Sequence, residues 1–422
     1  MKKPNLKKMF KGLGPGFITG ASDDDPTGIG TYTQTGAMFG YRQLWLAPFS
    51  LPFMIVVQEM SGRIGIVTGR GLAWVIRQHY PRPILYIIVL GLTTANIFAI
   101  GANLGAMTAS IQLLIKDLPF VPLMFVVASV ILVLQVIVPY RRYTHILKYL
   151  ALSLLAYIAT AFFINHDWKD LLTSTVLPSI DLSKDYMLNI VAVMGTTISP
   201  YLFFWQTGQE VEEQVKNKQL KNFNSGKPKM NINNIKKMRT DTIIGMAFSN
   251  IVMFFIIASA GSVFAGGITE INTATEAAQA LEPVAGQYAQ GLFALGIIGT
   301  GLLAIPILAG SASYAVSEVF QWKASLSFNI KQAPGFYGVI ACATAIGVVI
   351  NFLGISVFQT LYYAAIISGF VSPPIIFLML RITNNKKIMG HYTNSRFTNI
   401  LGYLIVTIMT LSACGLIISL IS

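Results

Sequence analysis

The sequence carries little charge. Only 11% of its 422 residues are Asp, Glu, Lys or Arg, and 54% are hydrophobic. A soluble domain has about 25% charged residues, so this composition excludes an ordinary soluble globular protein and indicates that lipid surrounds most of the folded chain. We therefore predict an all-α polytopic membrane protein that forms a single transmembrane domain over residues 1–422.

Long polar segments that could form a separate soluble domain are also absent. Apolar segments recur along the whole chain instead, and each is close to the roughly 20 residues that a helix needs to cross a bilayer. About 11 transmembrane helices are predicted, over 13–38, 43–66, 84–115, 119–139, 145–165, 187–210, 241–266, 288–320, 335–353, 356–380 and 398–421.

Cysteine and histidine are scarce. The two cysteines, Cys342 and Cys414, fall inside predicted spans, with no spacing typical of a metal site or a disulfide. The four histidines lie in loops or at the ends of spans, which excludes a histidine metal centre or a base in mid-membrane. An intramembrane aspartic protease needs facing aspartates from two spans, whereas every mid-membrane aspartate here lies on one span. We predict that the protein is not an enzyme and binds no cofactor.

The little charge that is present is mostly basic, with a formal net charge of +13. The predicted topology accounts for it without a nucleic-acid partner. With the N-terminus inside, all but four of the 30 Lys and Arg residues lie on the cytoplasmic side, as the positive-inside rule requires. The basic N-terminus lacks the cleavage site of a signal peptide. We predict a multi-pass protein of the plasma (inner) membrane, with a cytoplasmic N-terminus and an external C-terminus.

Two of the predicted spans are interrupted by the same pattern. Asp25-Pro26 in the first span and Ser199-Pro200 in the sixth each place a side-chain oxygen before a proline, which is typical of the start of a helix. A helix that starts in mid-membrane requires that the preceding helix has stopped. Broken helices that open two equivalent halves are typical of inverted-repeat transporters, whose binding site lies where the breaks meet.

The breaks divide the chain into two predicted repeats, about 13–165 and 187–380, followed by an extra helix at 398–421. The Lys- and Asn-rich stretch 207–240 follows the sixth span, and its polarity predicts a partly flexible cytoplasmic loop. In the external stretch 267–287, apolar residues at helical spacing predict a short surface helix.

Three consecutive aspartates, Asp23, Asp24 and Asp25, form the only run of charge well inside a span. Each charge at the bilayer centre costs about 2.5–3.5 kcal/mol on insertion scales, so such a run needs water, a cation or protons. One interpretation is that Asp25 only caps a helix while Asp23 and Asp24 lie in an aqueous vestibule. The other is that they bind a cation, although adjacent side chains point in different directions and all three are not expected to face one ion.

The residues around the two breaks offer oxygen. They contribute hydroxyl groups and backbone carbonyls that the breaks set free, and neither break itself contains Cys, Met or His. Soft transition metals prefer thiolate, thioether or imidazole, whereas carboxylate, carbonyl, hydroxyl and water suit Mg²⁺, Mn²⁺ or Ca²⁺. The pattern therefore favours a hard divalent cation. The oxygen donors nearest to Asp25 are Ser22, Thr27, Thr196, Thr197 and Ser199.

Three further acidic residues lie near the cytoplasmic ends of spans. Their simplest interpretation is ion pairing with nearby basic residues, and a functional role is the alternative. These acids are Glu59, Asp241 and Glu318, and the candidate partners are Arg63, Arg239 and Lys323.

Several stretches together resemble one family. GPGFITGASDDDPTGIGTYTQTGAMFGYRQLW and the later GRIGIVTGRGLAWVIRQHYP resemble the first two spans of the Nramp family of divalent metal transporters. MRTDTIIGMAFSN resembles the start of that family's seventh span, and LAGSASYAVSE resembles its eighth. The likeness covers most of the first ten spans. It implies the LeuT fold, with two inverted five-helix repeats, in agreement with the broken helices.

The resemblance also implies a set of metal ligands. The family's aspartate ligand falls on Asp25, its carbonyl ligands fall on Ser22 and Thr196, and its polar residue in the tenth span falls on Gln359. Its methionine ligand falls on Ser199, and the neighbouring aspartates remain candidates. The predicted metal-site residues are therefore Asp25, Ser22, Thr196, Ser199, Asp24, Asp23 and Gln359.

The departures from the family pattern concern selectivity. The family's asparagine ligand falls on Gly28 and is lost, the soft methionine becomes Ser199, and a histidine becomes Tyr201. The third span, where the family carries acidic proton-relay residues, has no Asp, Glu, Lys, Arg or His over 84–115. These changes resemble the Nramp-related magnesium transporter branch, and Mg²⁺ suits a larger, oxygen-lined site because it keeps several waters.

We therefore predict a monomeric divalent metal transporter. It is expected to carry Mg²⁺, and also to admit Mn²⁺, as a partly hydrated ion and without proton coupling. Three alternatives stay open. One is a proton-coupled Mn²⁺ or Fe²⁺ symporter of the Nramp type. Another is a LeuT-fold transporter of a small organic substrate such as an amino acid. The third is a metal-sensing or structural membrane protein.

Overall fold

The computed structural model describes the chain over residues 14–115, 117–138, 155–163, 168–229, 232–264 and 271–421. Almost all regular structure in these ranges is helical, as the composition predicted. The basic N-terminal tail, both ends of the span predicted at 145–165 and Ile268 of the external stretch lie outside these ranges, as do single residues or pairs of other predicted segments.

The helices follow one another closely along the chain. Besides these α-helices, the described ranges contain one short 3₁₀ helix, Gly286–Tyr288. The helices are α2 (Pro15–Asp23), α3 (Pro26–Phe39), α4 (Leu46–Thr68), α5 (Leu72–His79), α6 (Arg82–Leu114), α7 (Phe120–Ile137), α9 (Leu155–Phe163), α10 (Trp168–Val176), α11 (Lys184–Thr197), α12 (Pro200–Lys216), α13 (Ile232–Val263), α14 (Ala274–Gln279), α15 (Glu282–Ala285), α16 (Ala289–Phe320), α17 (Pro334–Ile350), α18 (Val357–Thr383), α19 (Lys386–Met389) and α20 (Arg396–Ile421).

Seven helical segments in the described ranges are long and apolar enough to cross a membrane, with α11 and α12 taken as one segment. They contain α6, α7, α11 with α12, α13, α16, α18 and α20. The apolar α17 is shorter, with 17 residues, and α4 has 23 residues that include buried Glu59 and Arg63. The broken pair α2 and α3, and the described part of the 145–165 span in α9, complete the predicted set.

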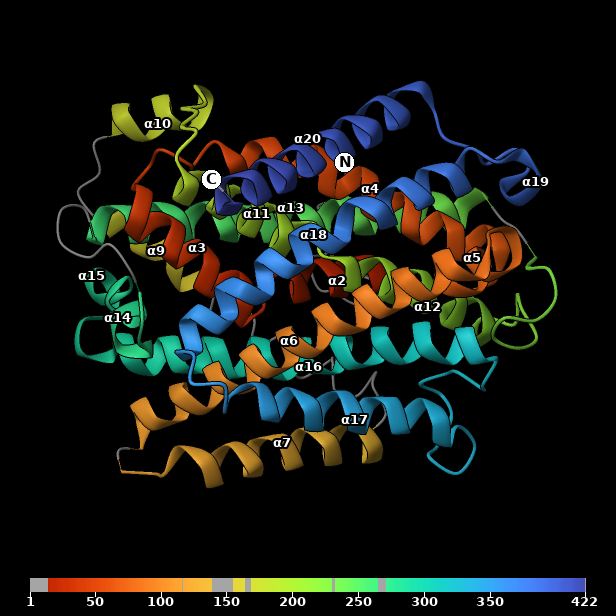
Figure 1. The fold of residues 1–422 in the computed structure, drawn as a ribbon, viewed down its shortest axis with the longest axis horizontal. Coiled ribbons are helices and arrows are strands. Elements are labelled where there is room, and N and C mark those ends of the chain that lie inside the picture. The colour runs from red at the N-terminus through yellow and green to blue at the C-terminus, as the bar shows by residue number, and fades with distance from the viewer. Residues whose placement is uncertain are drawn as a thin grey trace, which may run out of the picture.

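The long helices run roughly along one direction, with the broken pairs at the centre of the bundle (Figure 1). The first half-helix, α2, packs mainly on α13 and also contacts α12 and α16. Its continuation, α3, packs on α13, α18 and α11. In Figure 1, α16, α17 and α7 lie toward one edge of the bundle and α20 lies toward the other, while α6 runs diagonally across the middle. Other helices therefore surround the first predicted break, with α13 in contact with both of its half-helices.

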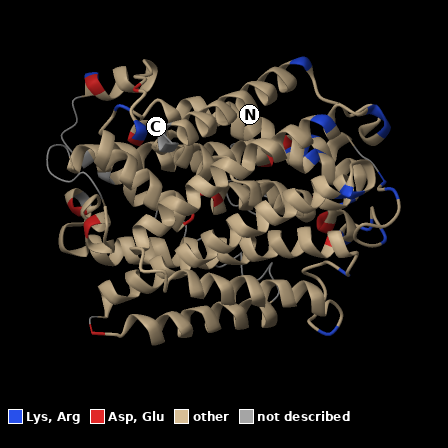
Figure 2. Cartoon of the chain, viewed as in Figure 1, with Lys and Arg blue, Asp and Glu red and all other residues tan. Residues whose placement is uncertain are grey.

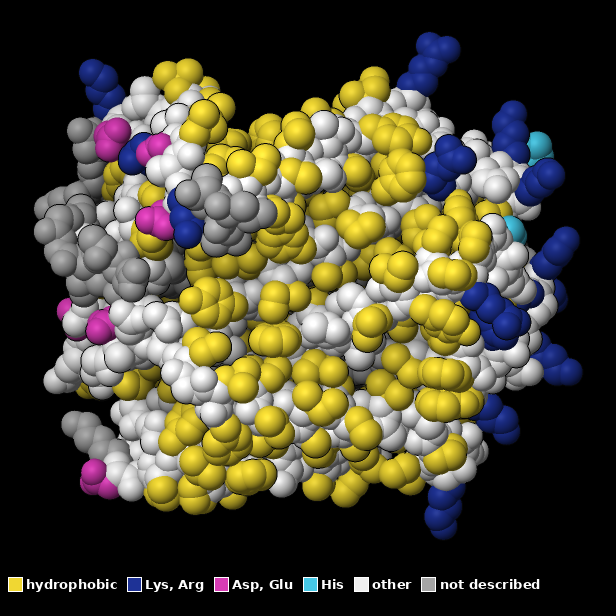
Figure 3. Space-filling view, in the orientation of Figure 1, with side chains coloured by type: hydrophobic (Ala, Val, Ile, Leu, Met, Phe, Trp, Pro, Cys, Tyr) yellow, Lys and Arg dark blue, Asp and Glu magenta, His cyan; other side chains and the backbone are white. Residues whose placement is uncertain are grey.

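The surface between the two ends of the bundle is apolar. Figure 3 shows hydrophobic side chains spread over the middle of the visible face, with charged side chains gathered at the two ends. Ile87 and Leu90 on α6 are each 69% exposed, and Ile137 on α7 is 72% exposed. Large apolar side chains of this kind are stable on a surface when lipid covers them.

The ends of the bundle differ in charge. Lys and Arg gather at the end that carries α5, α19 and the connection after α12, here called the basic end (Figure 2). Asp and Glu lie mostly at the end that carries α10, α14 and α15, here called the acidic end (Figure 2). This separation agrees with the charge pattern that led us to place the basic end in the cytoplasm, and that orientation stays a prediction.

The predicted loop at 207–240 is too long. The structure continues α12 to Lys216 and begins α13 at Ile232, so the connection is about half as long as expected. The polar residues that suggested a loop are packed inside the protein, because Glu210, Glu212 and Gln214 are all buried. A polarity scale cannot separate residues that face water from residues that face other polar groups in the bundle.

The short helix predicted in the stretch 267–287 is confirmed within the described residues. It consists of α14, which begins with a capping box between Thr273 and Glu276, and the short α15 that follows. Ile271, Ala274, Ala278 and Leu281 face the protein interior, as their helical spacing indicated. The pair of short helices covers part of the acidic end beside α16.

Candidate functional site

The first break lies between α2 and α3. Asp24 and Asp25 have non-helical backbone angles, and the Asp25 side chain accepts a hydrogen bond from the Gly28 amide at 2.8 Å. Asp25 therefore caps α3, and Pro26 occupies the first helical position, where its missing N–H does no harm. This is the geometry that the Asp-Pro pattern predicted.

The second break also consists of two non-helical residues followed by a proline at the start of a helix, but its capping hydrogen bonds differ. Ile198 and Ser199 separate α11 from α12, and Pro200 begins α12. The Ser199 hydroxyl does not cap α12, contrary to the prediction. It donates to the carbonyls of Gly195 at 2.9 Å and Thr196 at 2.7 Å, and it thereby satisfies the end of α11 instead.

The two breaks meet. A Cβ atom placed on Gly28 would lie 3.1 Å from the Asp23 carbonyl oxygen and 3.4 Å from Thr196 Oγ1. The Tyr201 hydroxyl donates to the Ser22 carbonyl at 3.0 Å, and so links α12 to the end of α2. The absence of a side chain at Gly28 is what allows the two breaks to approach this closely.

The structure brings six of the seven predicted metal-site residues into this buried region. Each of them is at most 3% exposed; they are Ser22, Asp23, Asp24, Asp25, Thr196 and Ser199. Gln359 is not among them. It is exposed in the first turn of α18 and lines a separate cavity of about 160 Å³ with Gln34 and Asp185. In this conformation Gln359 is therefore not part of the region where the two breaks meet.

Asp25 has a partner that the sequence analysis did not identify. Asn103 on α6 donates to Asp25 Oδ2 at 2.8 Å, and it accepts from the Thr27 hydroxyl at 2.9 Å. Both carboxylate oxygens of Asp25 thus hold one hydrogen bond each, from Asn103 and from the Gly28 amide. The signal was present, since an asparagine in a long apolar span is costly unless it is hydrogen-bonded.

Asp23 and Asp24 share one hydroxyl group. Ser249 Oγ on α13 lies 3.0 Å from Asp23 Oδ2 and 3.0 Å from Asp24 Oδ1, and a hydroxyl has one proton to donate. The other oxygens, Asp23 Oδ1 and Asp24 Oδ2, are buried without a hydrogen-bond partner. Both residues are fully buried, so the interpretation that they lie in an open aqueous vestibule does not hold for this conformation.

The acidic side chains do not form a ready-made cage. No three Asp, Glu, His or Cys side chains of the described ranges converge to hold a metal ion. This agrees with the expectation that three adjacent aspartates cannot face one point. Any cation at the breaks would have to combine at most two carboxylates with backbone carbonyls, hydroxyls and water. Mg²⁺ and Ca²⁺ accept such mixed oxygen ligands.

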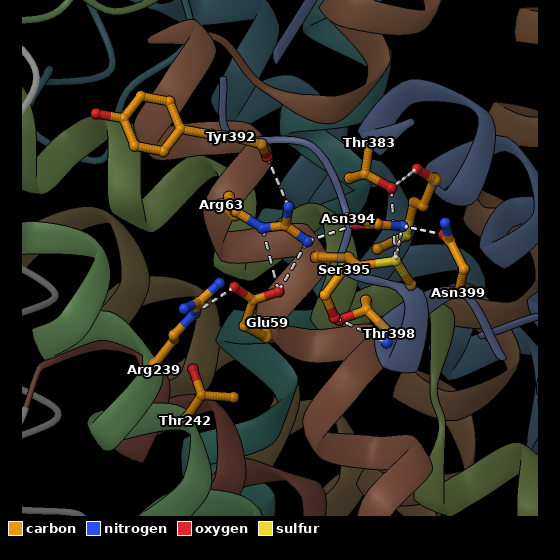
Figure 4. A network of polar contacts seen from close by, with 12 residues as sticks. Glu59, Arg63, Arg239, Thr242, Thr383, Tyr392, Asn394, Ser395, Thr398 and Asn399 are labelled. Atoms are coloured by element: carbon orange, nitrogen blue, oxygen red, sulfur yellow. Dashed lines mark hydrogen bonds and ion pairs between the residues drawn. The ribbon is translucent and has the colours of Figure 1, made fainter. Parts of the chain in front are cut away.

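A network of polar side chains around Glu59 and Arg63 lies at the basic end. Glu59 on α4 lies between two arginines (Figure 4): Arg63 at 3.0 Å and Arg239 of α13 at 2.7 Å. Buried Arg63 also donates to the Tyr392 carbonyl and to the Asn394 side chain in the connection before α20. The predicted ion pairing of Glu59 is therefore confirmed, and the network joins α4, α13 and the segment 390–395.

The other two acids at this end have different partners from those predicted. Asp241 accepts a hydrogen bond from the Gly14 amide, immediately before α2, while the neighbouring Arg239 is bound to Glu59. Glu318 accepts from the Trp74 amide at 3.0 Å and from the Asn224 side chain at 3.3 Å. An ion pair between Glu318 and Lys323 is not found in the part of the chain that the structure describes.

Comparisons with known proteins agree with this architecture. The family model described as natural resistance-associated macrophage protein-like (Nramp) matches residues 16–419. A protein named divalent metal cation transporter MntH from Caldanaerobacter subterraneus is 26% identical over 412 residues, which are 95% of this chain and 91% of the relative. A protein of the same name from Clostridium acetobutylicum is 27% identical over 423 residues, which are 96% of this chain and 90% of the relative.

Solved structures show the fold. The Eremococcus coleocola manganese transporter superimposes with a TM-score of 0.73 at 15% identity, covering 98% of this chain and 87% of its own. Mhp1, a nucleobase-cation-symport-1 family transporter, superimposes with a TM-score of 0.59 at 12% identity, covering 96% of this chain and 89% of its own. The predicted all-α LeuT fold is confirmed.

The contact between Asn103 and Asp25 generates a prediction. Asn103→Ala removes the donor to Asp25 and the acceptor of Thr27, so the carboxylate can turn away from the break. We expect the affinity for Mn²⁺, used as a spectroscopic probe, to fall at least tenfold by electron paramagnetic resonance titration. Loss of buried hydrogen bonds to a charged group should also lower the unfolding free energy by about 1–3 kcal/mol.

Asn96→Ala is the matched control, because Asn96 lies on the same helix and donates to the Leu308 carbonyl and to Ser311 instead. It should lower thermal stability and leave Mn²⁺ affinity unchanged. Equal affinity losses in the two variants would show that Asn103 acts only through stability.

Proposed function

The chain belongs to the Nramp family. We propose that it is a divalent metal cation transporter that carries Mg²⁺, and also Mn²⁺, through the region where the two helix breaks meet. The ion crosses as a partly hydrated species. The proposal is supported by the relatives named divalent metal cation transporter, which align over nearly the whole chain, and by the buried carboxylates at the breaks.

The single observation that carries the choice of ion is the oxygen chemistry of the meeting point. It offers the Asp25 carboxylate, the carbonyls of Ser22 and Thr196, and the Ser199 hydroxyl, all buried. These ligands include no sulfur, although Met253 Sδ on α13 lies 3.9 Å from Thr197 Oγ1. A ligand set without a thioether lacks the ligand that favours softer metals over Mg²⁺.

In the described residues no three Asp, Glu, His or Cys side chains come together to hold a metal, and this also favours Mg²⁺. Mg²⁺ demands six ligands at about 2.0–2.1 Å and gives up water reluctantly, so proteins bind it through one or two carboxylates and several waters. A single well-held carboxylate, Asp25, surrounded by weaker oxygen donors fits such an ion better than one that must be fully stripped of water.

The same features disfavour an organic substrate. A LeuT-fold transporter of an amino acid would direct the positive ends of its half-helices at the substrate's carboxylate. Here the start of α3 is already occupied by the carboxylate of Asp25, with Asp23 and Asp24 beside it. Like charges at this position would repel an anionic group.

We also propose that the basic end faces the cytoplasm of the plasma membrane, that the chain acts as a monomer, and that transport is uncoupled from protons. Two observations support the absence of coupling. The third span has no Asp, Glu, Lys, Arg or His over 84–115, and its buried polar residues include the amides Asn96 and Asn103. Tyr201 stands where the resembling family has histidine, and a phenol does not change protonation near neutral pH.

The first test of this proposal concerns Asp25. Asp25→Asn keeps one oxygen for capping α3 but removes the negative charge and turns an NH₂ group toward the Asn103 donor. We expect Mg²⁺ uptake into proteoliposomes to fall at least 100-fold, in protein whose melting curve shows that it is folded. Asp117→Asn is the matched control, because Asp117 is exposed at a positive φ that Asn tolerates. Wild-type uptake by the Asp25 variant would refute the assignment.

The second test concerns selectivity. Ser199→Met introduces a thioether and frees the Thr196 carbonyl from its hydrogen bond, so the ratio of Cd²⁺ to Mg²⁺ uptake should rise at least tenfold. Adding Gly28→Asn should lower Mg²⁺ uptake further, because the new side chain would crowd Asp23 and Thr196. Ser199→Ala, which also removes the hydroxyl but adds no sulfur, is the control and should not favour Cd²⁺.

The third test concerns energy coupling. Moving one charge through 100 mV is worth about 2.3 kcal/mol, so a divalent ion gains roughly 4.6 kcal/mol, enough for a gradient on the order of 2,000-fold without protons. With the voltage clamped and a pH-sensitive dye inside proteoliposomes, Mg²⁺ entry should cause no acidification. Acidification that tracks entry would refute uncoupled transport and would direct attention to Asp23 and Asp24, each of which has one buried oxygen without a partner.

A further inference from the structure

A small polar cavity lies at the basic end, apart from the helix breaks. Its volume is about 80 Å³, and it is lined by residues of α12 and α13, by the connection after α12, by Ile66 of α4, and by Pro15 at the start of α2. One water needs about 10–15 Å³ of such space. The cavity can therefore hold a cation together with several waters.

Two buried carboxylates face this cavity. Glu210 is 6% exposed and Asp241 is 5% exposed. Glu210 accepts one hydrogen bond from Gln206 at 3.1 Å, and Asp241 accepts one from the Gly14 amide. Neither forms an ion pair with another described residue. Buried carboxylates without a cationic partner are costly, so they indicate a place where a cation is expected.

An amide oxygen in the same cavity has no partner. Gln214 is 3% exposed, and its side-chain nitrogen donates to the Ile66 carbonyl at 2.7 Å. Its Oε1 atom is buried and accepts no hydrogen bond. A lone buried acceptor beside two carboxylates suits a hard cation and repels an anion, because all three groups present oxygen lone pairs.

The remaining charges at the cavity leave room for a divalent ion. Glu213 also lines it, and its carboxylate pairs with Lys216 at 3.6 Å. Lys237 is the one cationic residue among the described lining residues, and its side chain is exposed. A flexible surface lysine can move away when a more highly charged ion with fixed ligands enters.

The cavity is connected to α2 through Asp241. The carboxylate that faces the cavity also binds the Gly14 amide, and α2 lies on α13 so closely that a Cβ on Gly20 would come within 2.2 Å of the Gly245 carbonyl carbon. At its other end α2 is held by Ser249 through Asp23 and Asp24. A cation bound to Asp241 would compete with the Gly14 amide for the same carboxylate.

We propose that this cavity is a second divalent-cation site, separate from the helix breaks, and that its occupation loosens the start of α2 from α13. The part of the proposal that concerns α2 rests on the proposed transport function; the binding does not. Filled from the basic end, the site makes the opening of α2 depend on the divalent ion concentration on that side. The ion that has crossed thereby acts on the helix that leads to the central site.

The binding test counts sites on the purified full-length chain with Mn²⁺, by calorimetry and by electron paramagnetic resonance, with Mg²⁺ as competitor. We expect two sites in the unchanged protein and in Glu282→Gln, which alters an exposed carboxylate at the acidic end. The double variant Glu210→Gln with Asp241→Asn should keep one site, and Asp25→Asn should keep the other.

The possible outcomes separate the two proposals. Two sites in the Glu210→Gln, Asp241→Asn variant would overturn the cavity site. Two sites in Asp25→Asn, with one in the double variant, would leave the cavity site standing and remove the central one. If the double variant does not fold, Gln214→Lys replaces it, since the new ammonium group would occupy the cavity, and it too should keep only the central site.

The test of α2 measures the accessibility of a cysteine at its surface. Phe17→Cys, in a protein with Cys342→Ser and Cys414→Ser, places a thiol where Phe17 packs against Phe248 of α13. Saturating Mn²⁺ should accelerate maleimide labelling at least threefold, and Gln214→Lys should label fast without any metal. Labelling that ignores Mn²⁺ in the otherwise unchanged protein would overturn the link between the cavity and α2.

Discussion

The structure depends on one electrostatic constraint, the burial of three consecutive carboxylates at the centre of a membrane bundle. Insertion scales put each charge at about 2.5–3.5 kcal/mol, and no described basic residue pairs with them. The helix break offsets part of this cost, because only a new helix start can direct a free amide, that of Gly28, at Asp25. In a continuous helix that amide would instead donate to the backbone carbonyl four residues earlier. The break and the charge therefore require each other.

The helix α13 is the element that keeps this region in register. It holds the start of α2 through Asp241, packs against its middle through Gly245, and binds Asp23 and Asp24 at its end through Ser249. Because these contacts are spaced along the whole of α2, the half-helix cannot tilt away at one end without disturbing the carboxylates at the other. Any motion that opens the basic end must therefore change the environment of the central site.

The positions of the breaks could be predicted from the sequence because Asp-Pro and Ser-Pro are local signals, and the apolar segments gave the helices around them. The partners could not be predicted in the same way. Asn103 and Ser249 lie 78 and 225 residues from the aspartates that they bind, and only the packing of α6 and α13 brings them there. Gln359, which the resemblance placed among the ligands, lies exposed in the first turn of α18 and away from the breaks. The polar end of α12 was mistaken for a loop because buried polar contacts and solvent look alike in composition.

Asp25 and the two predicted carbonyl ligands at the breaks already hold hydrogen bonds within the protein, whereas Asp23 and Asp24 each keep one oxygen without a partner. The Ser22 carbonyl accepts from Tyr201, the Thr196 carbonyl accepts from Ser199, and both oxygens of Asp25 accept from neighbouring donors. A cation that enters must share or displace these hydrogen bonds, so part of its binding energy is cancelled by the bonds that it weakens. This arrangement gives weak binding and easy release. It suits an abundant ion that keeps most of its own water, and it suits poorly a scarce metal that must be captured from low concentration.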